Sequence, residues 1–101
     1  SPNMIGRIFD QVPFPGWALE HAAITETSLM MYFAPELVRQ DLIADVDHVD
    51  PGFCYRYPID KNSIPSNGVL ATARSSSALK GQWIVEDVVS NISDFIRREF
   101  C

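Results

Sequence analysis

The last third of the sequence carries the pattern that most restricts the fold, a long stripe of apolar residues at helical spacing. From Ile84 to Phe100 the apolar residues recur at intervals of three and four, with an acidic pair early and an arginine pair late. This pattern predicts a helix of about twenty residues with one wide apolar face and with charges that suit the helix dipole. The stripe consists of Ile84, Val85, Val88, Val89, Ile92, Phe95, Ile96 and Phe100. Such a face needs a large apolar partner, and the rest of the sequence contains no convincing run of core strands to provide one.

Composition limits the class of protein. The chain has 101 residues, of which 47% are apolar and 21% charged, as expected for one small folded domain. A net charge of −5 argues against a nucleic-acid partner. No apolar run approaches the ~18 residues that span a bilayer, and the N-terminus lacks a signal-peptide pattern. Cys54 and Cys101 lie far apart without metal-binding spacing, which favours free thiols and a cytoplasmic location.

Turn and helix signals divide the remainder. Apolar spacing predicts a helical turn around Met4 to Phe9 and a helix from Glu20 to Phe33, and Pro35 fits the first position of another short helix. A stretch rich in proline and turn formers follows, with at most one short strand near Phe53 to Tyr57. The predicted segments are a lead-in at 1–15, a motif-bearing helix and short helix at 16–44, a long loop at 45–74, and an amphipathic helix with upstream serine caps at 75–101.

The stretch "PGWALEHAAITETSLMM" contains the residues best suited to chemistry. Trp17, Glu20, His21 and Glu26 lie within ten positions, near an expected helix start where unpaired N–H groups favour negative charge. Histidine is the side chain whose ordinary pKa lies near neutral pH, which suits it to proton transfer. Glu26 is close enough to bond His21 if the first turn is irregular. Capping and packing are the more usual explanation of the same residues. From the residues alone, both interpretations stay open.

A second polar cluster, "DVDHVDP", resembles a metal site only superficially. Asp45, Asp47, His48 and Asp50 lie within six residues, but the glycine and glutamate of a calcium loop are missing and zinc sites favour separated histidines and cysteines. We therefore interpret this segment as a solvated acidic loop.

The motif stretch resembles the creatininase (creatinine amidohydrolase) family. The resemblance continues through "PELV", "DHVDPGF" and "YPIDKNSIPSNGVLATARSSSALKGQWIVEDVV" to "IRREF", and so covers almost the whole chain. His21, two alanines and the E-T-S triplet that begins at Glu26 resemble the broad family, whereas the Gly-Trp and Glu-His pairs resemble creatininase itself.

The resemblance implies an α/β fold, in which this chain is the mostly helical C-terminal part of a three-layer α/β/α sandwich with a parallel central sheet. It implies hydrolysis of creatinine to creatine, with two divalent ions, zinc or manganese, that activate water. By resemblance, His21 passes a proton to the ring nitrogen, Glu26 orients that histidine, and Trp17 closes over the substrate. Ala18, at a substrate-binding position, stands where typical creatininases carry an acid, which leaves the substrate open.

The family's metal ligands are Glu-x-His, a following Asp and His-x-Glu, and they lie upstream of everything matched here. This chain contains neither Glu-x-His nor His-x-Glu, so we expect the ligands outside it. We accordingly expect this chain to be a C-terminal portion that is inactive alone and works with an N-terminal half. We also expect a homo-oligomer, which in this family is often a hexamer. Two alternatives remain: a hydrolase of another cyclic amide or formamide, and a non-catalytic helical interaction domain.

Overall fold

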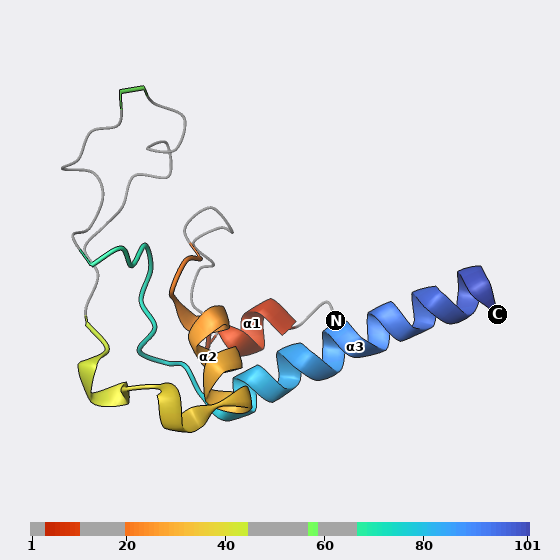
Figure 1. Cartoon of the computed structure of the whole chain (residues 1–101), viewed down its shortest axis with the longest axis horizontal. Coiled ribbons are helices and arrows are strands. Elements are labelled where there is room, and N and C mark those ends of the chain that lie inside the picture. Colours follow the sequence, from red (N-terminus) through yellow and green to blue (C-terminus); the bar gives the residue numbers. More distant parts are fainter. Residues whose placement is uncertain (1–3, 11–19, 45–56, 59–66) are drawn as a thin grey trace.

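The chain folds around three helices, seen in a computed structural model that describes residues 4–10, 20–44, 57–58 and 67–101 (Figure 1). Within these ranges the secondary structure is helical and no strand occurs, so the parallel sheet expected for the family is not found in the described part of this chain. The strand expected near Phe53 lies outside the described residues. The elements are α1 (Met4–Ile8), α2 (Ile24–Phe33), the 3-10 helices η2 (Pro35–Leu37) and η3 (Gln40–Leu42), and α3 (Ala78–Phe100).

The long helix α3 confirms the helix predicted from the apolar stripe. It begins after Ser77, whose hydroxyl accepts the backbone N–H of Lys80 at 3.1 Å. This bond satisfies one of the amides that a helix start leaves unpaired. Arg97 and Arg98 lie in the last turn, where their charges complement the helix dipole. The upstream serine cap and the basic end were both readable from the sequence.

A close crossing joins α2 to the start of α3. Ser28 is fully buried, and its hydroxyl accepts the N–H of Ser77 at 3.2 Å. Gly81 lies against the same turn, so that a Cβ built on it would stand 2.1 Å from the Ser28 carbonyl oxygen and 2.8 Å from the Cβ of Tyr32. Only glycine therefore allows the two backbones to approach this closely.

The apolar core is small and lies where the three helices meet. Ile8, Phe9 and Ile24 are buried together, and Met4 and Ile84 pack against them. Arg7 stacks over the Trp83 ring at 3.9 Å from its centroid, which adds a cation–π contact between α1 and α3. The core thus takes up only the first part of the apolar stripe of α3.

The second half of α3 projects beyond the other described elements (Figure 1). Its apolar residues from Val88 onward are exposed, from 47% at Val88 to 77% at Phe100. Among the helices described, none is both long and apolar enough to cross a membrane.

An ion pair joins Asp10, just after α1, to Lys80, near the start of α3. Lys80 is buried, and its Nζ donates to Asp10 Oδ2 at 2.9 Å and to the Ser75 carbonyl oxygen at 2.8 Å. The hydrogen bond from Lys80, with a smaller contribution from Ser75, holds the pKa of Asp10 below its usual value. The contact joins residues 70 positions apart in the sequence.

Two boundaries differ from those predicted. The helix expected from Glu20 begins at Ile24 instead, because Ala22 has a φ of +54°, a left-handed conformation that a right-handed helix does not accept. Pro35 does occupy a first helical position, but the short helix predicted there is split into η2 and η3.

Candidate functional site

His21 lies in the turn that leads into α2, in residues 20–23. Its side chain is exposed, and its carbonyl oxygen accepts the N–H of Leu70 at 3.3 Å. The next residue, Ala22, has the left-handed φ described above. The imidazole therefore stands on a tight turn, open to its surroundings, while the backbone beneath it is fastened to the segment before α3.

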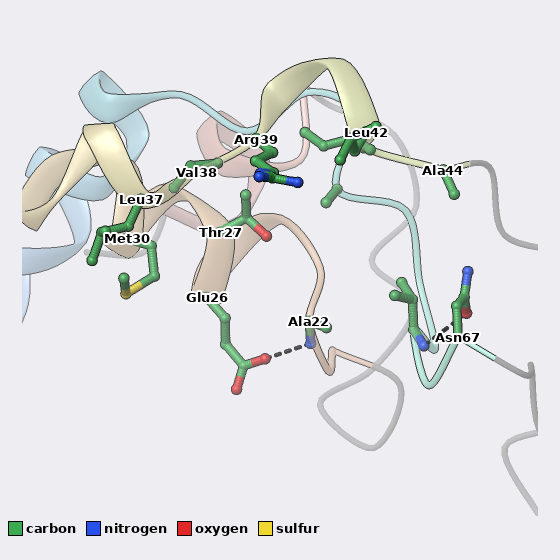
Figure 2. A pocket seen from close by; sticks show the side chains of 13 residues that line it. Ala22, Glu26, Thr27, Met30, Leu37, Val38, Arg39, Leu42, Ala44 and Asn67 are labelled. Atoms are coloured by element: carbon green, nitrogen blue, oxygen red, sulfur yellow. Dashed lines mark hydrogen bonds between the residues drawn. The ribbon is translucent and has the colours of Figure 1, made fainter.

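Glu26 closes this turn from the helix side. Counted from the N-cap Ala23, it is the third helical residue, and its Oε2 accepts the N–H of Ala22 (Figure 2). This resembles the reciprocal half of a capping box, in which a glutamate in the first turn reaches back to an amide before the helix. The bond is made to the peptide that follows His21 rather than to the imidazole, so any influence of Glu26 on His21 passes through the backbone.

Glu20 closes the turn from the other side. Its Oε1 accepts the N–H of Thr25 at 2.7 Å and the Thr25 hydroxyl at 2.8 Å. The carboxylate is buried, with 8% of the residue exposed. A negative group at this place is favoured by the dipole of α2. The sequence indicated a dipole partner here, but the specific bonds to Thr25 were not anticipated.

A cavity of about 490 Å³ adjoins the turn (Figure 2). Ala22, Glu26 and Met30 line it on the side of the turn and α2, and most of the remaining wall is apolar. Arg39 and Asn67 add polar groups at its rim, and Asn67 Oδ1 already accepts the N–H of Val69 at 3.1 Å. The cavity could hold a small molecule next to the His21 turn, although His21 itself does not line it.

The remaining predicted site residues belong to two other segments of the sequence. Trp17 and Ala18 lie outside the described residues, as do the four polar residues of the acidic loop at 45–50. Within the ranges described, no three His, Cys, Asp or Glu side chains come close enough together to hold a metal ion. These residues alone do not fit a metal centre.

Comparison with known proteins places this geometry in context. Residues 9–96 match the creatinine amidohydrolase family, described as creatininase. A creatinine amidohydrolase from Pseudomonas putida is 38% identical over 99% of this chain, which spans 38% of that protein.

Solved structures agree in fold. A glutamate-to-glutamine mutant of creatininase complexed with creatine is 35% identical, with a TM-score of 0.85 over 99% of this chain and 39% of its own. The same mutant in a zinc–zinc form gives a TM-score of 0.86 at the same identity, and a manganese creatininase gives 0.84; this chain covers 38% of each. The chain therefore corresponds to well under half the length of the proteins it matches.

Proposed function

Because this chain belongs to the creatinine amidohydrolase (creatininase) family, we propose that the protein carrying it hydrolyses creatinine to creatine. The observation that carries the proposal is the exposed His21 on a turn whose backbone is held by Glu20, Glu26 and Leu70. A proton-transfer group must be accessible to substrate and yet held in a defined position. His21 meets both requirements.

In this proposal His21 is the proton donor to the departing nitrogen. Water adds to the carbonyl carbon of the lactam ring and gives up a proton to the imidazole, the C–N bond breaks, and the ring nitrogen takes that proton from the imidazole as it leaves. Histidine suits this step because its ordinary pKa lies near neutral pH, where it can both hold and release a proton. Glu26 is then a positioning residue that fixes the peptide after His21 through the Ala22 amide.

Two sequence-based roles complete the substrate site. We assign Trp17 to the wall that closes over the substrate and excludes water. Ala18, beside Trp17, lacks the carboxylate expected at this position. Its absence favours an alternative substrate, namely another cyclic amide or a formamide. A panel of such compounds alongside creatinine distinguishes these possibilities.

The similar structures include manganese and zinc–zinc forms of creatininase, and we infer that the full-length protein uses two divalent metal ions. The described residues form no group of three or more potential ligands, and we assign the metal ligands to polypeptide outside the described ranges, chiefly an N-terminal portion. We further propose that the full-length enzyme is homo-oligomeric and cytoplasmic. This chain alone is then inactive.

The decisive experiment replaces His21 by alanine in the full-length protein. We expect kcat on creatinine to fall by about 10²- to 10⁴-fold while the bound metal, measured by elemental analysis, stays constant. Ser90→Ala, on the exposed face of α3, is the matched control and retains activity. A His21→Ala protein with unchanged kcat removes His21 from the mechanism.

The second candidate, a non-catalytic interaction domain, is favoured by one observation, the exposed apolar face on the second half of α3. It predicts that the full-length protein turns over none of the tested amides.

A further inference from the structure

The Glu20 carboxylate occupies an unusual place for a helix cap. Helix α2 has Ala23 at its N-cap, which offers no side-chain oxygen, and no cap bond is made by that residue. The acceptor comes instead from three residues upstream, where Glu20 Oε1 receives both the N–H and the hydroxyl of Thr25. Glu20, the residue before His21, therefore caps α2 in place of the N-cap residue.

This arrangement is costly as a stabilising device. Glu20 is only 8% exposed, and its second oxygen, Oε2, is buried with no hydrogen-bond partner among the described residues. A buried charged oxygen without a partner opposes folding. Ala23 is itself fully buried, so a capping side chain at position 23 would also have to be accommodated inside the protein. Glu20 caps α2 in its place, and one of its oxygens is left buried without a partner among the described residues.

The arrangement has a second consequence, which concerns His21. The Glu20 bond to Thr25 fixes the residue before His21 to the first turn of α2, and the Glu26 bond to Ala22 fixes the residue after it. The two bonds run in opposite directions across the same turn, so they bracket His21. A turn with a left-handed residue in it would otherwise exchange with other conformations.

We propose that Glu20 is a positioning residue for His21, acting through Thr25 and the first turn of α2. The inference rests on the proposed function, since it concerns the reach of the His21 imidazole toward a substrate. It assigns to Glu20 an effect on the chemical step rather than on substrate affinity, because a displaced proton donor slows bond cleavage more than binding.

The test compares four full-length proteins: wild type, Glu20→Met, His21→Ala and the double variant. Methionine matches the size of glutamate but cannot accept the Thr25 bonds. The loss of these bonds and the removal of the buried charge have opposite effects on stability, so the melting temperature should change little. We expect kcat on creatinine to fall about ten- to a hundredfold with KM within about twofold. In the His21→Ala background the same change should have no further effect on kcat, because Glu20 acts through His21.

Three further variants keep the test decisive if Glu20→Met folds poorly. Glu20→Gln keeps the acceptor and should retain kcat within about threefold, whereas Thr25→Val, which loses the hydroxyl, should lower it more than Thr25→Ser. Glu86→Gln, an exposed glutamate on α3, is the matched control.

The outcomes separate the two proposals. An unaffected His21→Ala protein, or a wild type without turnover, refutes the proposed function and this inference together. Two outcomes refute the positioning role alone, provided that His21→Ala is slow. In the first, Glu20→Met is folded and has a normal kcat. In the second, the losses in kcat of the two single variants multiply in the double variant. If Glu20→Met does not fold, equal kcat in Thr25→Val and Thr25→Ser refutes it.

Discussion

The two halves of α3 carry the same amphipathic pattern but have different surroundings. The first half contains Lys80, Gly81 and Ile84, which meet α1, α2 and the segment before the helix. The second half, from Val88 to Phe100, leaves its apolar side chains exposed within the described structure. The periodicity of a helix thus predicts that it has an apolar face, but it does not predict which part of that face the same chain covers.

The largest expected effect tests the crossing in the first half. Gly81→Ala adds a Cβ that would lie 2.1 Å from the Ser28 carbonyl oxygen, a backbone atom that cannot move aside cheaply. We expect a loss of about 3 kcal/mol or more in the free energy of unfolding, measured by chemical denaturation of the full-length protein. A solvent-exposed helical glycine would instead gain about 0.5–1 kcal/mol on replacement by alanine, so a stabilised variant would show that the crossing is not this close.

A matched pair of truncations compares the two halves directly. In the 101-residue chain, Ile84→Ala should cost about 1–3 kcal/mol, because Ile84 packs against the core and is partly buried. Phe95→Ala, at a residue 50% exposed, should cost less than about 0.5 kcal/mol. Denaturant midpoints provide the measurement.

The same two substitutions in the full-length protein test whether other polypeptide covers the second half of α3. If polypeptide outside this chain covers the second half of α3, Phe95→Ala becomes as costly as Ile84→Ala. If Phe95→Ala has the same small effect on the free energy of unfolding in the 101-residue chain and in the full-length protein, the apolar face on the second half of α3 stays exposed.

The smallest expected effect concerns the ion pair at the start of α3. The pKa of Asp10 is lowered in the folded protein by its bond to Lys80, so the unfolded chain binds more protons in that range. The resulting stability is fully present above the ordinary pKa of about 3.9 and is lost as the pH falls through the lowered value. Below about pH 4 the melting temperature should therefore decrease less steeply with falling pH for Lys80→Met and for Asp10→Asn than for the wild type. Identical acid profiles in all three proteins would rule the pair out as a source of acid sensitivity.

Local signals in the sequence were sufficient for much of the helical structure. The apolar stripe and Ser77 predicted α3 and its cap, and Pro35 marked the start of η2. The start of α2 was predicted four residues too early, because the alanines after His21 have good helical propensity and nothing local indicates a left-handed φ at Ala22. That conformation is held by bonds from Glu20 and Glu26 to backbone groups across the turn.

The candidate site divides in the same way. Family resemblance singled out His21 and Glu26, and the structure brings both into one turn. Glu20 was predicted only as a partner of the helix dipole. Its bonds to Thr25 were not predicted, because a carboxylate that accepts from a residue five positions away leaves no distinctive sequence pattern. The one available signal was the alanine at the N-cap, which leaves an amide without a side-chain acceptor nearby.

The sequence was enough to predict where helices form and which residue types gather near His21, since spacing and local propensity act over a few neighbouring positions. The bond from Lys80 to Asp10 and the contact of Gly81 with Ser28 became visible only in the folded chain. Such contacts join residues far apart in the chain, and their geometry depends on how whole helices pack, which no local pattern encodes.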